Sequence, residues 1–201
     1  MRCDLLKTVA VASLLLVGRM GQSAIIEYEA FLSGANEPPS GNSSPGTGFA
    51  DVLFDSVAQT LEVKVTFSNL EAGTTASHIH APTSAPFTGA AGVATTTPTF
   101  PGFPLGVTSG TYDHTLNLTD LASYNPAFVT ANGGTAASAE AALIAAMNAG
   151  KSYLNIHTSQ FPGGEISGYL VVPESSSTAV LLIRSLLVMA WFGRQRRMRV
   201  A

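Results

Sequence analysis

The chain has 201 residues, of which 46% are hydrophobic and only 11% are charged, and this length is typical of one domain with appended segments. The single cysteine is Cys3, so the remainder of the chain has no disulfide, no thiolate metal site and no cysteine nucleophile. Residues 24–172 carry eleven acidic and two basic residues, a formal net charge of −9, which argues against a nucleic-acid partner because it repels phosphate.

Residues 1–24 have the layout of a secretory signal peptide. Arg2 and Lys7 precede an apolar run that extends from Val9 to Val17. Small residues follow this run at the spacing that a signal peptidase requires. Arg19 lies between the apolar run and these small residues, which leaves the position of cleavage open. We therefore predict export of the chain; the alternative is a short N-terminal helix packed on the core.

The stretch from residue 60 to 70 is the clearest of several predicted β-strands. Leu61, Val63, Val65 and Phe67 alternate with polar residues, which predicts one buried and one solvated face. An antiparallel sheet over a single core requires this alternation. Turn residues separate the further predicted strands, which lie at residues 25–33, 47–55, 76–81, 108–119, 151–158 and 164–172.

Other segments of the middle region lack this period of two. Residues 83–106 are rich in glycine, proline and threonine and are predicted to form a loop. Two short helices are expected, one capped at Thr119-Asp120 and one at residues 138–149 that ends at Gly150. The pattern predicts an all-β fold, an antiparallel β-sandwich of the immunoglobulin-like or superoxide-dismutase-like Greek-key type, with one or two short helices inserted and a hydrophobic helix at each terminus.

Three of the four histidines lie in two of the predicted strands. His78 and His80 are two residues apart and therefore share one face of their strand. His157 shares a face with Tyr153 and Asn155. If the two strands are neighbours, the three imidazoles converge on one ion. Three histidines with an open coordination position suit zinc or copper.

Two alternatives bear on this predicted metal site. Glu165 and Asp113 are candidate additional ligands. The other interpretation is structural, because histidines beside turns often donate to carbonyl or hydroxyl oxygens and so fix loops. His114 lies alone in a threonine-rich strand and is expected on the surface.

The C-terminal tail combines an apolar run with a cluster of arginines. Residues 179–192 would span about 21 Å as a helix, which is short of the roughly 30 Å hydrocarbon core of a bilayer. Arg184 near its middle costs about 2.5–3.5 kcal/mol on insertion scales. The tail is therefore a poor permanent anchor, and the four arginines that follow argue against a buried core helix.

Val172, Pro173 and Glu174, followed by a serine linker, the apolar run and the arginines, resemble the bacterial PEP-CTERM sorting signal. The resemblance implies recognition by a membrane transpeptidase of the exosortase type, cleavage near the Pro-Glu pair, and a Gram-negative bacterium that produces exopolysaccharide. Ser175 stands where the signal usually has proline, which leaves the efficiency of cleavage open. The sorting tail is thus expected at residues 173–201.

Residues 25–172 resemble the chordin-type (CHRD) domain. The resemblance lies in LSGANEPP at residues 32–39, ASHIHAP at residues 76–82 and SYLNIHTSQFPGGEISGYL at residues 152–170. Ser167 is a departure, because the family commonly has arginine there. The resemblance implies an all-β module of matrix and extracellular proteins.

The His-x-His pattern is also similar to that of copper–zinc superoxide dismutase. The chain lacks the disulfide of that family, and only His114 is left for its additional ligand positions. Dismutase activity is therefore not expected.

These patterns lead to one main functional hypothesis and one alternative. The main hypothesis is an exported, non-enzymatic module of the bacterial envelope or extracellular matrix, processed by signal peptidase and an exosortase, with an adhesive, structural or ligand-binding role towards polysaccharide or matrix proteins. Its membrane association would be transient, through the tail. The alternative is a zinc- or copper-binding or redox protein that uses His78, His80 and His157.

Overall fold

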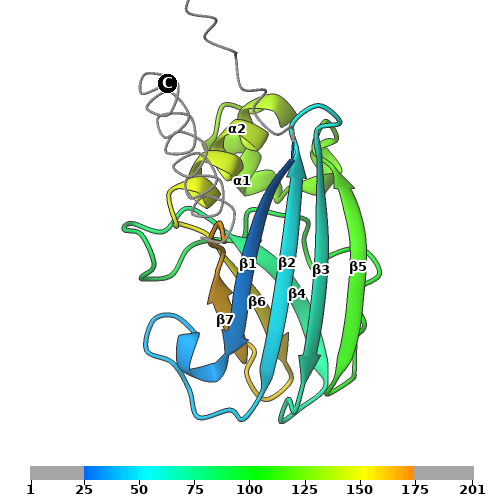
Figure 1. Ribbon diagram of the computed structural model, residues 1–201, viewed down its shortest axis with the longest axis vertical. Coiled ribbons are helices and arrows are strands. Elements are labelled where there is room, and N and C mark those ends of the chain that lie inside the picture. The colour runs from blue at the N-terminus through cyan, green and yellow to red at the C-terminus, as the bar shows by residue number, and fades with distance from the viewer. Residues whose placement is uncertain (1–24, 174–201) are drawn as a thin grey trace, which may run out of the picture.

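Seven strands form one continuous antiparallel sheet in the computed structural model, which describes residues 25–173. The strand order across the sheet is β4-β6-β7-β1-β2-β3-β5 (Figure 1). Each strand predicted from the sequence is present. Their bounds are β1 (Ile25–Ser33), β2 (Thr47–Asp55), β3 (Thr60–Ser68), β4 (Thr74–His80), β5 (Gly110–Asn117), β6 (Tyr153–Thr158) and β7 (Ile166–Tyr169).

The sheet curls on itself into a half-barrel, whereas the sequence analysis predicted two stacked sheets (Figure 1). The two halves, β4-β6-β7 and β1-β2-β3-β5, are joined where β7 meets β1. Ser33 pairs with Ser167 there, and Glu29 and Val171 exchange two backbone hydrogen bonds of 2.8 and 2.9 Å. Alternation of apolar residues predicts a buried face, but it does not reveal whether two layers share a hydrogen-bonded edge.

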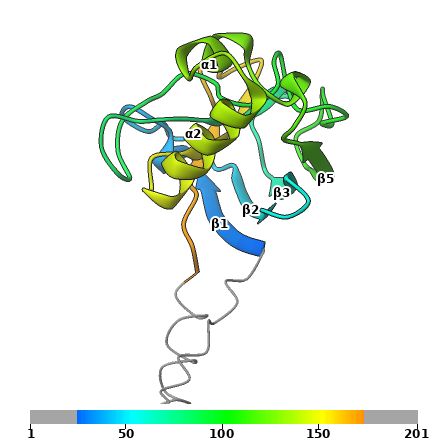
Figure 2. The ribbon, with the colours of Figure 1, turned by 90° about the horizontal axis from the view of Figure 1, so that it is seen from above.

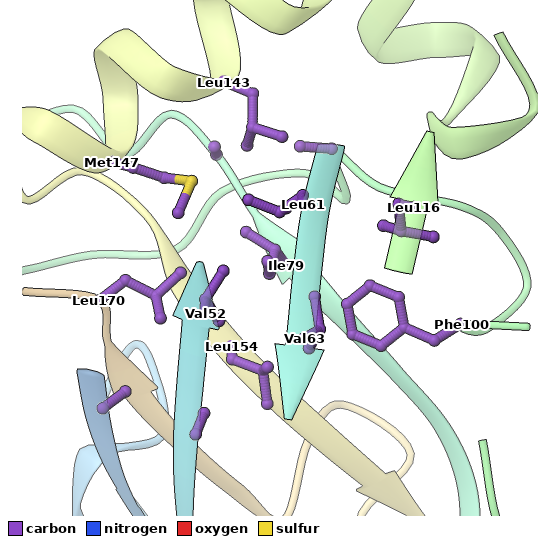
Figure 3. Close-up of a cluster of buried hydrophobic side chains, with 14 of the residues drawn as sticks. Val52, Leu61, Val63, Ile79, Phe100, Leu116, Leu143, Met147, Leu154 and Leu170 are labelled. Atoms are coloured by element: carbon purple, nitrogen blue, oxygen red, sulfur yellow. The ribbon is translucent and has the colours of Figure 1, made fainter. Parts of the chain in front are cut away.

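The hydrophobic core lies inside the curl (Figure 3). Val52 and Val63 from one half of the sheet meet Ile79 and Leu154 from the other, and all four side chains are fully buried. Burial of one such side chain contributes about 1.5–3 kcal/mol. The inward-facing positions therefore hold the two halves together.

Helices close one end of the half-barrel (Figures 1 and 2). Leu143 and Met147 of α2 (Ala136–Asn148) reach into the core beside Leu61 and Leu170 (Figure 3). The remaining helical segments are η1 (Gly34–Asn36), η2 (Leu121–Ser123) and α1 (Pro126–Ala131).

The helix caps agree in part with the sequence analysis. Asp120 caps η2 as predicted, because its side chain accepts a hydrogen bond from the backbone N–H of Ala122. Helix α1 was not predicted, although Asn125 caps it and Pro126 occupies its first turn, and both are helix-start signals.

The long connection between β4 and β5 runs along the free edge of β4. The backbone N–H of Ala94 donates to the carbonyl of Ile79 at 2.9 Å, and that of Phe100 donates to the carbonyl of Ser77 at 3.0 Å. The hydroxyl of Tyr112 on β5 donates to the Pro101 carbonyl at 3.1 Å. This connection, predicted as a loop, therefore bridges the two edges of the sheet.

Two regions predicted from the sequence lie outside the described residues. They are the signal peptide at 1–24 and the tail from Glu174 onward, with the hydrophobic helices expected in them. Within residues 25–173, no helix is long and apolar enough to span a bilayer.

The buried carboxylate of Glu165 connects three separate parts of the chain. It accepts hydrogen bonds from the Ser44 hydroxyl at 2.6 Å, the Glu71 backbone N–H at 2.7 Å and the Thr158 hydroxyl at 2.6 Å. Glu165 is fully buried, so these donors replace the water that the carboxylate has lost. The residue is thus a structural centre for two loops and the end of β6.

Replacement of Glu165 should therefore destabilise the fold. In Glu165→Gln an amide N–H₂ faces donors instead of an acceptor, so we expect a loss of about 2–4 kcal/mol in the free energy of unfolding. Chemical denaturation of the full chain measures this loss. Glu27→Gln, on an exposed part of β1, is the control and should change stability by less than about 0.5 kcal/mol. An equal effect of the two substitutions would contradict the role of Glu165.

Candidate metal centre

The three predicted histidines converge on the outer face of the half-barrel, where β4 and β6 are neighbours. His80 lies opposite Tyr153 in the β4–β6 ladder. His157 lies opposite Ala76, which is two residues before His78 and on the same face of β4. One ligand nitrogen from each ring can be chosen so that all three lie within 4.8 Å of one another. The predicted convergence is therefore present in the structure.

Loops cover this outer face, and each imidazole is bonded to a different loop carbonyl. The ring nitrogens His78 Nε2, His80 Nδ1 and His157 Nδ1 bond to the carbonyls of Pro98, Ala91 and Pro162 at 2.6, 2.9 and 2.9 Å. A carbonyl only accepts, so each of these nitrogens carries the hydrogen. The three bonds therefore fix both the tautomer and the orientation of each ring.

The opposite nitrogen of each ring is buried and has no hydrogen-bond partner. These atoms are His78 Nδ1, His80 Nε2 and His157 Nε2. His78 and His80 are only 6% and 8% exposed, so bulk solvent does not reach these atoms. A buried, unsatisfied polar group costs about 1–3 kcal/mol. Three such atoms at one place call for a ligand that all three can share.

The spacing of the rings is close to that of a metal site. Three atoms within 4.8 Å of one another fit on a circle with a radius of about 2.8 Å, which is 4.8 Å divided by √3. Zinc binds imidazole nitrogen at about 2.0–2.1 Å, so each nitrogen needs to move inward by less than about 1 Å. The ring centroids are 5.2–5.9 Å apart.

Burial keeps the three imidazoles neutral at pH 7. It lowers the pKa of His80 to about 4, and it lowers the pKa of His78 and His157 below the ordinary value of 6.5. Desolvation of the charged form is the largest cause for each ring, and the carbonyl bonds oppose it. A neutral imidazole keeps the lone pair that metal coordination requires.

The other candidate residues do not join the cluster. The carboxylate of Glu165 is occupied by the three donors described above. Asp113 is exposed on β5 and lies opposite Lys64 in the register between β5 and β3. His114, expected on the surface, is half-buried and lies 6.1 Å from the ring of Tyr112. Of the sorting motif, Val172 and Pro173 are described, and Glu174 is not.

Glu37 was not identified from the sequence, yet it lies beside the cluster on the same face. Its Oε1 accepts a hydrogen bond of 2.8 Å from Asn155 Nδ2, and Asn155 pairs directly with His78. Glu37 Oε2 and Asn155 Oδ1 are buried without partners. A Cβ on Gly164 would overlap the Glu37 carboxylate, which explains the second glycine of FPGGE. The motifs GANEPP and FPGGE are thus in contact, which their spacing does not reveal.

Burial raises the pKa of Glu37 from 4.5 to about 7. Between pH 4.5 and pH 7, Glu37 is protonated in the folded protein and ionised in the unfolded chain. The contribution of Glu37 to stability is therefore fully present below about pH 4.5 and is lost as the pH rises through 7. Glutamine does not titrate. We therefore expect the free energy of unfolding of Glu37→Gln, relative to the unsubstituted chain, to rise by up to about 3 kcal/mol between pH 4 and pH 8.

Denaturant unfolding of both chains at the two pH values measures this difference. The three histidines are present in both chains, so their own titration cancels. Glu27→Gln is again the control, and a difference for Glu37→Gln that is the same at both pH values would contradict the assignment.

Comparison with known proteins gives one match. The CHRD domain family matches residues 28–170, which include most of β1, all of β2 to β7 and the whole histidine cluster. No curated protein and no solved structure was found to match the chain. The matched range spans more than half of the chain, so the protein belongs to the CHRD domain family.

Proposed function

We propose that this protein is an exported CHRD module that binds one Zn²⁺ or Cu²⁺ ion through His78, His80 and His157. Two observations support the proposal: each ring has a buried nitrogen that lacks a partner, and one ligand nitrogen of each ring lies within 4.8 Å of those of the other two. Hydrogen bonds to the backbone carbonyls of Pro98, Ala91 and Pro162 account for the opposite nitrogen of each ring. An ion would satisfy the three remaining lone pairs at once.

The structural interpretation of the histidines is compatible with this proposal. The bonds to Pro98, Ala91 and Pro162 do attach loops to the sheet, but they use only one nitrogen of each ring. Histidines that bind metals in proteins usually donate their second N–H to a carbonyl or carboxylate. The same three bonds would thus orient the rings for the ion.

The donor set favours zinc or copper over harder cations. Three neutral nitrogens suit Zn²⁺ and Cu²⁺, whereas Ca²⁺ and Mg²⁺ prefer oxygen ligands. An ion held by three imidazoles keeps a position for water or an external ligand. An ion that binds the folded chain and not the unfolded chain would also stabilise the fold, by about 2.7 kcal/mol at a free metal concentration of 100 times Kd.

The location and wider role follow from the sequence and the family. CHRD domains occur in secreted proteins, and residues 1–24 and 173–201 have the patterns of a signal peptide and a sorting tail. CHRD is in general a non-catalytic family, and an adhesive, structural or ligand-binding role in the envelope or matrix agrees with this. Polysaccharide or matrix proteins are the proposed partners, and signal peptidase and an exosortase the proposed processing enzymes.

Metal binding by the full chain tests the central proposal. After treatment with a chelator and its removal, titration with Zn²⁺ or Cu²⁺ should show one site per chain and a rise in Tm. His157→Ala, at the least buried of the three positions, should weaken binding by at least about 100-fold, because an ion with three protein ligands then keeps only two. His114→Ala is the matched control and should bind as the unsubstituted chain does.

The triple variant of His78, His80 and His157 to alanine should bind no metal. Circular dichroism of each metal-free variant separates loss of the site from loss of the fold. Binding of the same stoichiometry and affinity by a folded triple variant would contradict the proposal.

The sorting motif is testable in a bacterium that has an exosortase-type system. The mature chain should lack both ends and be recovered at the cell surface or in the matrix. The double variant Pro173→Ala, Glu174→Ala should keep its C-terminal mass and stay with the membrane fraction, while Val171→Ala should be processed normally. Identical masses for the double variant and the unsubstituted chain would contradict the assignment of the motif.

A further inference from the structure

A groove lies beside the candidate metal centre and is separate from it. The turn at residues 35–41 forms one side, residues 87–89 form the other, and Tyr169 of β7 completes the lining, around a cavity of about 400 Å³. None of the three cluster histidines lines it. Glu37 does, so the groove contains a buried carboxylate whose Oε2 has no hydrogen-bond partner.

The position of the Glu37 carboxylate is fixed. The residue is only 8% exposed, Asn155 Nδ2 holds Oε1 at 2.8 Å, and the carboxylate occupies the space that a side chain at Gly164 would need. The hydroxyl of Ser167 lies near enough to the Glu37 carboxylate to lower its pKa, and it donates to the carbonyl of Asn36 at 2.9 Å. Glu37 therefore cannot turn away to find water or another donor.

Two of the side chains that line the groove already donate to backbone carbonyls. Asn36 Nδ2 donates to the Phe31 carbonyl at 3.1 Å, and the Tyr169 hydroxyl donates to the Gly89 carbonyl at 2.8 Å. Among residues 25–173, Lys64 is ion-paired with Glu62 at 2.7 Å, and no basic side chain is bonded to Glu37. Within these residues the Glu37 carboxylate therefore has no bonded counter-charge, and a cationic ligand would supply one.

Two aromatic rings stand at the groove and suit a cation. Phe87 is 59% exposed and has a backbone φ of 56°, a conformation that is rare for a bulky residue and is often found at functional sites. Its ring meets that of Tyr169 edge to face, with centroids 6.2 Å apart. The faces of aromatic rings attract ammonium and guanidinium groups.

We propose that this groove binds a primary ammonium or guanidinium group, such as a lysine or arginine side chain or a small polyamine, between the Glu37 carboxylate and the rings of Phe87 and Tyr169. The strongly negative charge of residues 24–172 would draw such a ligand towards the domain. A neutral sugar could donate hydrogen bonds, but it would leave the buried carboxylate without a counter-charge.

The test compares two probes that differ only in the charged end. N-acetyl-lysine amide carries the ammonium, and N-acetyl-norleucine amide has a similar chain without it. NMR or calorimetric titration of the full chain at pH 8, in the presence of a chelator, should show at least about tenfold tighter binding of the lysine probe. This comparison needs no variant, and the chelator makes it independent of the proposed metal site.

Two variants locate the binding. Glu37→Gln should abolish the preference for lysine over norleucine, while Glu27→Gln, which removes an exposed carboxylate outside the groove, should keep the preference. Equal binding of the two probes by the unsubstituted chain, no binding of the lysine probe at millimolar concentration, or binding of a neutral disaccharide in its place would overturn the proposal. An unchanged preference in folded Glu37→Gln would overturn it as well.

Discussion

Burial of the outer face of β4 and β6 under loops is the constraint on which the candidate site depends. The outer faces of β1, β2 and β3 are largely solvated, but β6 is buried on both sides. Polar side chains on that face lose water and must find partners within the protein. His78, His80 and His157 find theirs in loop carbonyls, and these bonds leave three lone pairs in a dry environment. The loops thus create the site by the same contacts that attach them to the sheet.

Glu37 and Asn155 are also polar side chains buried on this face, and their burial lowers the stability of the fold. A carboxylate that is held by one amide and has an unpartnered Oε2 is an expensive group to bury, and its raised pKa of about 7 expresses that cost. Glu165 shows the contrast, because three donors satisfy its carboxylate completely. Two buried carboxylates in one small domain therefore differ in role: Glu165 stabilises the fold, and Glu37 is the group for which we propose a ligand.

The sequence predicts local features of this fold well and distant contacts poorly. The period of two in residues 60–70 predicted β3, and the shared face of His78 and His80 followed from the same rule. Convergence with His157 requires β4 and β6 to be neighbours, and no local sequence pattern indicates which strands pair. The curl into one sheet depends on the pairing of Ser33 with Ser167, 134 positions further along the chain, for which no local signal exists. Glu165 was named as a candidate additional metal ligand for the same reason, since its actual partners Ser44 and Glu71 are equally remote in the sequence.

One loop serves both proposed sites, so they are not independent. The carbonyl of Ala91 orients His80, while the carbonyl of Gly89, two residues earlier, accepts from Tyr169 in the groove. The stacked rings of His80 and Tyr153, 4.8 Å apart, and the contact of Tyr153 with Tyr169 at 5.7 Å, link the two sites across the sheet. If a ligand at one site restricted the motion of this loop, the ligand at the other site would have less conformational entropy to remove. Such coupling is reciprocal by thermodynamic necessity, so a metal that tightens the groove would itself be held more tightly when the groove is filled.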